Sequence, residues 1–552
     1  MSVSFACLSM TNLHLRRLEY LLFGLVPLCF GLFAVFLGQD ANWDLRNYHF
    51  YNPYAFLYGR MDVDVAPAHV ATFYNPILYV PFYWMVVSLS PKLVGFLLGL
   101  MQGLNFIPLY FVSRQLITAF SPSHTSIQGH FEARACFISL CVAVLGLLGA
   151  GNVSELGTMF SDNILSILIL TALYVCLSAV SSGRLLPVAI AGLLCGLAMG
   201  LKQTTAVFGL GLCLALLFTP QGLPRGLLFA FIFGVTALIG MAVTGGYWLW
   251  EMWHRFGNPL FPYYNHIFKS PMAFQDAYRD ARFLPDGWRE WLFMPFILLK
   301  DPYQAGEVAF FDLRLALFYL VVVTGLIAAL ALRLKDKALM EKYLPAPMSV
   351  VLAFCAISYL LWLKVFAIYR YIVPLEMLAP LTLFLLIYSV MQNLRQSFRI
   401  WWLFAAILLV TTRPLAWDRV PWLPNAKDYF GVQLPEITDA DHTIILMTGY
   451  EPMAYLIPYF PRNIPFLRIH SYFTGPSDHP NGYDLLMQRR IAGHAGPIYV
   501  IFRSMDESTA ISATKAYGLH LVKEECQGMK PHIDRCCEGV LMFCAVKKDF
   551  TK

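Results

Sequence analysis

The feature that most constrains this chain is a series of apolar runs, several of them about twenty residues long. The first runs from Tyr20 to Leu37 and contains no charged residue. Roughly 20 apolar residues in a helix cross the hydrocarbon core of a bilayer. Of the 552 residues, 58% are hydrophobic and only 13% are charged, which is outside the range of soluble globular proteins. The sequence therefore predicts a mainly α-helical, polytopic membrane protein.

We expect about eleven transmembrane helices from the apolar runs. A shorter run, 77–89, is bordered by prolines and is interpreted as an interfacial or re-entrant helix. The expected spans lie near 20–37, 91–117, 135–150, 163–180, 185–201, 204–218, 227–249, between Phe311 and Arg333, near 346–366, between Arg370 and Gln392, and near 400–411.

Basic residues in short loops mark the cytoplasmic side of a membrane protein. Arg16 and Arg17 precede the first run, and no small-residue cleavage site follows it, so we expect a retained helix and a cytoplasmic N-terminus. The turns that carry Arg184 and Arg225, and the segment RLKDKALMEKYL, fall on the same side. With an odd number of spans, the first loop and the C-terminal region lie on the opposite, outer face.

From about Trp417 the hydropathy falls and short alternating segments begin. HTIILMTGY, PIYVIFRS, LHLVKEE and VLMFCAVKK read as strands, with a helix over 508–517. We therefore divide the chain into a membrane domain, 1–416, and a small extracytoplasmic α/β domain, 417–552. Four of the twelve cysteines lie in the second domain, and their three full disulfide pairings stay open: Cys526, Cys536, Cys537 and Cys544.

The first outer loop, GQDANWDLRNYHFYNPYAFLYGRMDVD, is dense in polar groups beside a membrane span, which is costly unless they have a function. Asp40 and Asp44 would share a face if the helix continued beyond the membrane, and like charges that close raise one pKa, as suits a general base. Two exposed aspartates with ordinary pKa values are the alternative. We prefer Asp44, because Arg46 and His49 follow it closely and it stands further from the hydrocarbon.

Glu155 and Asp162 form a second acidic pair in SELGTMFSD. They are seven residues apart, so they share a face if this turn begins a helix, with Ser154 or Ser161 as its cap. Helix capping alone would also explain Asp162. In the first loop, Asp62 and Asp64 have the spacing of a short acidic motif that holds a divalent metal, Mg²⁺ or Mn²⁺, in soluble sugar-nucleotide transferases; two aspartates paired by chance are the alternative.

Several cations are expected at the outer membrane edge, where the positive-inside bias disfavours them. Snorkelling to the interface is one explanation, and an anionic partner such as a lipid phosphate is the other. Lys202 and Arg370 are the strongest candidates, because each lies where a span meets an outer turn. The others are Arg279, Arg282 and Arg314, with Tyr369 beside Arg370 as an interface aromatic. Zinc-ligand spacing, a phosphate-binding G-x-x-x-x-G-K-[ST] loop and a G-x-S-x-G elbow are all absent from the sequence, and we expect no nucleic-acid partner.

Six segments together resemble the landmarks of the bacterial membrane glycosyltransferases of the C-type (GT-C) superfamily, in particular relatives of the polyprenyl-phosphate-mannose-dependent mannosyltransferases. The resemblance covers the spans from about Tyr20 to Thr411. The segments are WDLRNYHFYNPYA, SELGTMFSD, GLKQTT, WHRFGNPLFPYYN, RFLP and YRYIVPLE.

The resemblance implies a sugar donor carried on a polyprenyl phosphate, a catalytic aspartate in the first outer loop, and inversion at the anomeric carbon. Residue by residue, it assigns the aspartate to Asp44, the basic residue of the G-L-K turn to Lys202 and the arginine of R-Y-x-x-P to Arg370. This sequence lacks the paired Asp-Glu that protein mannosyltransferases carry in the first loop, which argues against a protein acceptor. A glycan or lipid acceptor and a location in the bacterial inner membrane are expected.

A lipid-linked sugar flippase, another transporter, or a membrane protein that binds a cell-envelope polymer is the alternative function. Transporters usually show internal repeats and buried charges at mid-membrane, whereas the charged residues here gather at one predicted face. The sequence therefore favours the transferase.

Overall fold

The computed structural model describes residues 2–120, 125–335, 343–423, 428–437 and 439–549. These residues form two compact units. Unit 1 contains Met1–Phe36, Phe96–Gly246 and Asp280–Trp417, and unit 2 contains Leu37–Gly95, Tyr247–Arg279 and Asp418–Lys552. Unit 2 thus combines nearly all of the predicted C-terminal domain with two segments from the predicted membrane domain.

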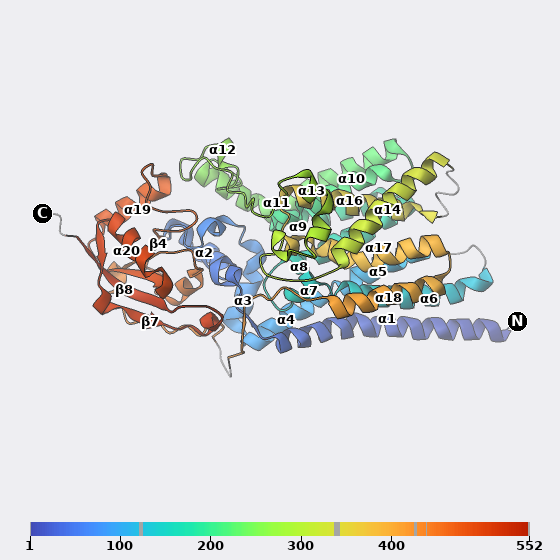
Figure 1. Ribbon diagram of the computed structural model, residues 1–552, viewed down its shortest axis with the longest axis horizontal. Coiled ribbons are helices and arrows are strands. Elements are labelled where there is room, and N and C mark those ends of the chain that lie inside the picture. Colours follow the sequence, from blue (N-terminus) through green and yellow to red (C-terminus); the bar gives the residue numbers. More distant parts are fainter. Residues whose placement is uncertain (1, 121–124, 336–342, 424–427, 438, 550–552) are drawn as a thin grey trace. The chain divides into compact units, whose positions relative to one another are not determined.

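Unit 1 is a helical bundle (Figure 1). Its helices, three of which include residues of unit 2, are α1 (Ser2–Leu37), α4 (Pro91–Gly103), α5 (Phe106–Thr118), α6 (Thr125–Gly146), α7 (Ala150–Ser154), α8 (Asp162–Ser182), α9 (Leu185–Leu201), α10 (Ala206–Ala215), α11 (Leu223–Phe256), α13 (Trp288–Ile297), α14 (Arg314–Lys335), α16 (Ala346–Val365), α17 (Val373–Met391) and α18 (Leu394–Thr411). The short turns η5 (Gln203–Thr205), η6 (Leu216–Phe218), η7 (Pro302–Gln304) and η8 (Tyr369–Ile372) connect them.

Helix α17 is the core of this bundle. It packs against α5, α6, α8, α14 and α18. Within the apolar stretch that contains it, Tyr369–Met391, 89% of an 18-residue window is buried, whereas the corresponding share in the apolar stretch of α1 is 22%. Residues at the start of α17 are therefore held on several sides by other helices.

Among the described residues, eight helical stretches are long and apolar enough to cross a membrane. They are Arg17–Leu37, Pro91–Thr118, Asp162–Ser182, Leu223–Phe256, Arg314–Leu332, Ala346–Val365, Tyr369–Met391 and Leu394–Thr411. Leu185–Leu201 and Gln203–Phe218 are shorter apolar helices, and α6 covers the remaining expected span. The fold is thus mainly helical, as expected for a membrane protein, while the count of about eleven spans stays a prediction.

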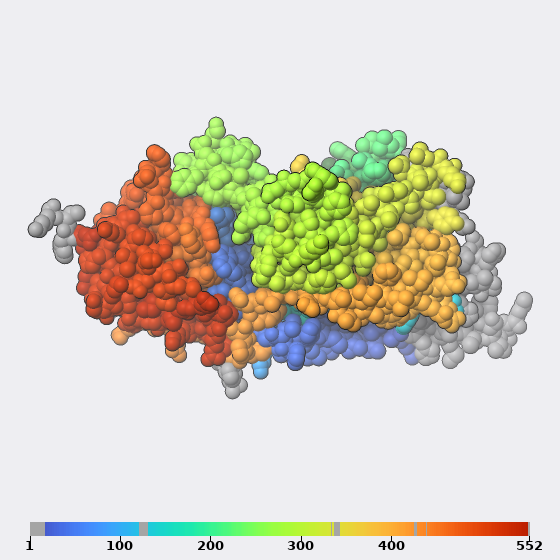
Figure 2. All heavy atoms as spheres, viewed as in Figure 1, coloured from blue at the N-terminus to red at the C-terminus, as the bar shows by residue number. Residues whose placement is uncertain are grey.

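Some apolar side chains of unit 1 remain exposed on the bundle surface. On α13, Trp288, Trp291, Leu292 and Phe293 are exposed, and the surrounding segment forms a broad patch, coloured yellow-green, on the face shown in Figure 2. Aromatic side chains of this kind are typical of residues that anchor a protein at a membrane interface.

Unit 2 is built around a mixed six-stranded sheet in the order β4-β3-β5-β8-β6, with β7 paired to β8. Strand β3 lies parallel to β4 and β5, whereas β8 lies antiparallel to β5, β6 and β7. The strands are β3 (Ile444–Met447), β4 (Phe466–Arg468), β5 (Ile498–Arg503), β6 (Leu519–Leu521), β7 (Gln527–Met529) and β8 (Leu541–Lys548), and the helices are α19 (Gly482–Gly493) and α20 (Glu507–Ala516).

The sheet confirms the four strands and the helix expected from the sequence, and adds the short strands β4 and β7. A capping box starts α19, because the Asn481 side chain accepts from the Asp484 N–H while the Asp484 carboxylate accepts from the Asn481 N–H. The disulfides pair Cys526 with Cys544 and Cys536 with Cys537, which resolves the three pairings left open by the sequence.

The first loop is folded onto this sheet rather than extended. Val65 pairs in parallel with Leu467 of β4, and Arg46 lies 3.5 Å from Asp534, which also pairs with Arg503 of β5. Strand β1 (Gln39–Asp40) pairs with β2 (Arg419–Val420). The other elements that Leu37–Gly95 and Tyr247–Arg279 contribute to unit 2 are the π-helical turn η1 (Leu45–His49), α2 (Tyr51–Leu57), η2 (Arg60–Asp62), η3 (His69–Phe73), η4 (Ile77–Tyr79), α3 (Val80–Ser88) and α12 (Asn265–Phe268).

Candidate functional site

One group of charged residues of unit 1 lies at one end of the bundle. Helices α8, α14 and α17 begin there, and α9 and α18 end there. Asp162, in the first turn of α8, contacts Lys202, directly after α9. Arg314, at the start of α14, donates to Thr412 Oγ1, directly after α18. Helices that alternate in direction bring these distant residues to one end.

Two buried carboxylates hold the N-terminus of the short helix α7. Gly151 N donates to Glu376 Oε2 at 2.9 Å, and Asn152 N donates to Glu376 Oε1 at 3.2 Å. Ala150 N donates to Asp312 Oδ2 at 2.8 Å. The first N–H groups of a helix have no partner within the helix. Carboxylates at this position accept their hydrogen bonds and interact favourably with the helix dipole.

The turn after α7 is fixed by one buried amide. The Gln102 side chain donates from Nε2 to Glu155 O at 3.0 Å and to Thr158 O at 3.1 Å, and its Oε1 accepts from Gly157 N at 2.7 Å. The backbone on both sides of Glu155 is therefore set by tertiary contacts before any ligand binds.

Glu155 is fully buried beside Asp162. Its Oε2 accepts from Asn163 N at 3.3 Å, and its Oε1 has no hydrogen-bond partner within the described part of the chain. Burial raises the pKa of Glu155 well above its usual value, the negative charge of Asp162 raises it further, and Lys202 and Arg370 oppose the rise. Burial thus favours the protonated form of Glu155, on which the charges of two cations, Lys202 and Arg370, also act.

Lys202 and Arg370 both lie close to the ring of Tyr371. Lys202 Nζ lies 2.7 Å from Asp162 Oδ2 and 5.1 Å from the centre of the Tyr371 ring. The Arg370 guanidinium lies 5.2 Å from the same ring centre, and its Nε lies 2.9 Å from Glu307 Oε2. Both cations thus have Tyr371 as a neighbour and act electrostatically on Glu155, and each already contacts a carboxylate of its own.

The other predicted binding residues of unit 1 lie outside this arrangement. Arg314 and Asp312 form a fully buried ion pair, with Arg314 Nη1 2.8 Å from Asp312 Oδ2, and so belong to the support of α7. Arg282 is 77% exposed and pairs with its neighbour Asp280. Tyr369 is buried with its ring 4.1 Å from Phe310, as a packing residue of the turn that carries Arg370.

The prediction that Asp40 and Asp44, and likewise Glu155 and Asp162, share one helical face is wrong. Helix α1 ends at Leu37, and Asp40 lies buried in β1, where Asn42 donates to it from N and Nδ2. Asp44 is half-buried at the start of η1 and accepts from Tyr48 OH at 3.4 Å. Glu155 and Asp162 are separated by a turn and do not share a helix; the tertiary fold alone brings them together.

His49 and the expected metal ligands have structural partners in unit 2. The buried His49 ring stacks on Tyr79 with centres 4.6 Å apart. Asp64 is buried and accepts from Arg60 Nε at 2.9 Å and from Tyr51 OH at 2.9 Å, whereas Asp62 is exposed and pairs with Arg255. Because the two carboxylates contact different arginines, this geometry does not fit a shared site for Mg²⁺ or Mn²⁺.

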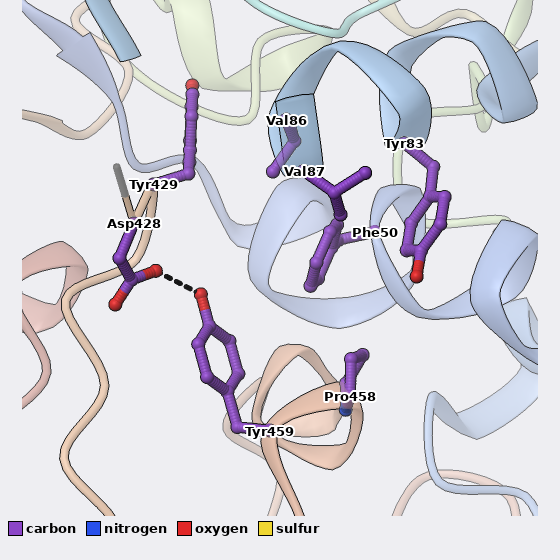
Figure 3. A pocket seen from close by; sticks show the side chains of 8 residues that line it. All are labelled: Phe50, Tyr83, Val86, Val87, Asp428, Tyr429, Pro458 and Tyr459. Atoms are coloured by element: carbon purple, nitrogen blue, oxygen red, sulfur yellow. Dashed lines mark hydrogen bonds between the residues drawn. The ribbon is translucent and has the colours of Figure 1, made fainter. Parts of the chain in front are cut away.

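Unit 2 also contains a cavity of about 250 Å³ (Figure 3). Tyr459 OH donates to Asp428 at its edge, and the Asp428 carboxylate also accepts from the N–H groups of Phe430 and Val432. The Asp428 carboxylate therefore already has three hydrogen-bond donors within unit 2. The residues that line the cavity are Phe50, Tyr83, Val86, Val87, Asp428, Tyr429, Pro458 and Tyr459.

Gln102, Glu307, Asp312, Tyr371 and Glu376 contribute to this arrangement and were not predicted from the sequence. Glu376 lies in YRYIVPLE, a segment singled out for its arginine, and an ionisable residue inside an apolar run is itself a signal of function. Glu307 carries no such local signal, because its role depends on its contact with Arg370. No protein-family model matches this chain, and the comparison with curated proteins finds no similar sequence.

Proposed function

We propose that this protein is an inverting glycosyltransferase that moves a sugar from a polyprenyl-phosphate donor to a glycan, lipid or other acceptor on the outer face of the bacterial inner membrane. The observation that carries the proposal is that Lys202 and Arg370 both lie within about 5 Å of the Tyr371 ring centre, at one end of an apolar helical bundle. A lipid phosphate requires cations at the edge of the apolar region, and arginine can bind it with two parallel hydrogen bonds.

The burial of Glu155, which favours its protonated form, supports this use of the cations. Asp162 and Glu307 already offset the charges of Lys202 and Arg370, so an ionised Glu155 would leave an excess of negative charge that repels a phosphate. A protonated Glu155 keeps the cluster near neutrality and can donate a hydrogen bond to a phosphate oxygen.

In the proposed reaction, Asp44 accepts the proton of the acceptor hydroxyl as its oxygen attacks the anomeric carbon. The bond between the anomeric carbon and the phosphate oxygen breaks, and its electron pair leaves with the lipid phosphate. Lys202 and Arg370 stabilise the charge that grows on this leaving group. The π-helical turn that begins after Asp44 supports its role, since such turns are frequent at functional sites.

The test is transfer by the full-length protein in detergent, with a radiolabelled polyprenyl-phosphate sugar and a membrane extract as the source of acceptor. Wild type should consume the donor without a second compartment, which a flippase would not do. Asp44→Asn should lower transfer by on the order of a hundredfold to ten-thousandfold, because the amide cannot accept the proton. Asp276→Asn, at an exposed aspartate of the same unit, is the matched control and should retain activity.

Two results would change the proposal. Wild-type transfer by a correctly inserted Asp44→Asn protein would move the base to Asp40 or Asp162. Failure of the wild type to consume the donor, together with donor movement across a vesicle membrane, would favour the flippase.

A further inference from the structure

In the sheet of unit 2, the chain connections diverge to opposite sides of β3 at its carboxyl end, which makes this a topological switch point. From β3 the chain enters β4 on one side, and then passes through α19 into β5 on the other side of β3. All three strands are parallel, so their carboxyl ends lie at one edge. In sheets of this kind, ligands bind outside the carboxyl ends where the connections diverge.

Exposed aromatic rings lie at this edge. Tyr450 follows β3 and Tyr472 follows β4; their ring centres are 4.5 Å apart, and they are 44% and 66% exposed. The His470 ring lies 5.2 Å from that of Tyr450. Large aromatic side chains this exposed, in contact with each other, form a flat surface suited to a ligand rather than to the protein core.

The first loop extends this surface toward the candidate base. The His69 ring lies 5.5 Å from Tyr472, and the Trp43 ring stacks on His69 with centres 5.8 Å apart. We call Trp43, His69, Tyr472 and Tyr450 the aromatic row. Trp43 directly precedes Asp44, so the row begins beside the proposed proton acceptor.

A buried arginine holds the aromatic row in place. Arg468 ends β4 and donates to His69 Nε2 at 2.6 Å, to Gly449 O at 3.0 Å and to Glu451 O at 3.1 Å. Burial lowers the pKa of His69 well below its usual value, so its imidazole is neutral and can accept this bond. The three segments that carry the row, namely the first loop and the loops after β3 and β4, are thus fixed relative to one another within unit 2.

The same edge has unused hydrogen-bonding capacity. Among the described residues, Thr448 Oγ1, Arg468 Nε and His470 Nδ1 are buried polar atoms without a hydrogen-bond partner. Most buried polar atoms in proteins have a hydrogen-bond partner. Three unpaired atoms at one strand edge therefore indicate a place where a ligand binds, or where water is bound until a ligand displaces it. Glu451 and Asp506 are half-buried nearby and interact electrostatically with Arg468 and His470.

We propose that the carboxyl edge of β3, β4 and β5 binds a neutral glycan, with pyranose rings stacked on the aromatic row. The flat apolar faces of sugars suit the exposed tyrosines, and the Glu451 and Asp506 carboxylates suit sugar hydroxyls, which donate hydrogen bonds. The same carboxylates repel phosphate, which disfavours an anionic lipid headgroup. The idea that this glycan is the acceptor of sugar transfer rests on the proposed function. The binding of the glycan is independent of the proposed function.

The test is binding of the full-length protein in detergent to an array of neutral and uronic-acid oligosaccharides, with phosphatidylglycerol vesicles as a separate probe. Wild type should bind neutral oligosaccharides, and the double variant Tyr450→Ala and Tyr472→Ala should bind at least about tenfold more weakly, as expected when aromatic anchors are truncated. Tyr264→Ala is the matched control, since Tyr264 is 43% exposed and lies in unit 2 outside the row. Phenylalanine at both positions should restore most of the binding.

The inference is overturned if wild type binds no oligosaccharide, if the double variant binds as wild type does, or if only the vesicles are bound. Sugar transfer with the membrane extract as the source of acceptor, measured in the same preparations, separates this inference from the proposed function. A wild type that transfers the sugar, together with a double variant that binds glycan weakly and transfers poorly, supports both. Glycan binding by a wild type that consumes no donor supports the glycan site and contradicts the transferase.

Discussion

Glu155 shows how one buried side chain links charge to stability. Its folded-state pKa lies above the unfolded value of about 4.3, so the native state binds more protons than the unfolded state between these two values. The stabilising contribution of the protonated group is complete below about pH 4.3 and is lost as the pH rises through the folded-state pKa.

We therefore expect the melting temperature of the wild type to fall more steeply with rising pH than that of Glu155→Gln, which stays neutral. Thermal unfolding in detergent from about pH 5 to about pH 8 measures this slope. Glu538→Gln, at an exposed position, controls for the general effect of losing a carboxylate. Parallel slopes in wild type and Glu155→Gln would show that Glu155 is ionised in the folded protein.

Arg370 separates phosphate binding from snorkelling. If arginine only reaches the membrane surface, Arg370→Lys should be nearly silent, because lysine reaches it equally well. If the guanidinium holds the donor phosphate with two hydrogen bonds, lysine loses one, and the donor KM should rise by about tenfold, with a larger rise in Arg370→Ala. Donor saturation curves measure the effect, and Arg282→Lys at an exposed ion pair should leave them unchanged. Identical curves for wild type and Arg370→Lys would leave Lys202 as the phosphate candidate.

At the scale of elements, helix α7 is the support on which Glu155 is placed. A side-chain methyl group at Gly149 would overlap the Glu376 carboxylate, which caps the N–H groups of Gly151 and Asn152. Gly149→Ala should therefore destabilise the fold by about 1–3 kcal/mol, as overpacking does in cores, and should lower transfer because Glu155 follows α7.

Melting temperature and transfer activity of Gly149→Ala measure the two effects. Gly234→Ala is the control, because Gly234 lies in α11 with open space around the added methyl group and alanine favours a helix. A Gly149→Ala protein with wild-type stability would mean that Glu376 does not hold α7.

At the scale of the whole molecule, the predicted orientation can be tested by cysteine labelling in intact cells. Gly475→Cys should react with an impermeant thiol reagent from outside, because the C-terminal region is expected there and open space surrounds this position. Asp336→Cys, in the basic loop, should not react; Asp336 lies outside the described residues. Labelling of both from the same side would contradict the order of the spans.

The sequence predicted what depends on neighbouring residues. Long apolar runs became helices, alternating runs such as PIYVIFRS became strands, and the helix expected over 508–517 is α20. These features follow from local hydrogen bonding and from the periodicity of apolar side chains, both of which can be read within a short window. The same reasoning selected Lys202 and Arg370, since cations at the outer ends of apolar runs stand out against the charge bias of membrane proteins.

Only the tertiary structure decided which distant residues meet. It placed Glu155 beside Asp162 through a turn, paired Arg370 with Glu307, and set Glu376 at the start of α7. It also ended the first helix before Asp40 and folded the first loop onto β4, which assembled the aromatic row. Contacts of this kind depend on helix direction, strand register and loop path. These are fixed by the packing of the complete core and therefore leave no signal in the local sequence.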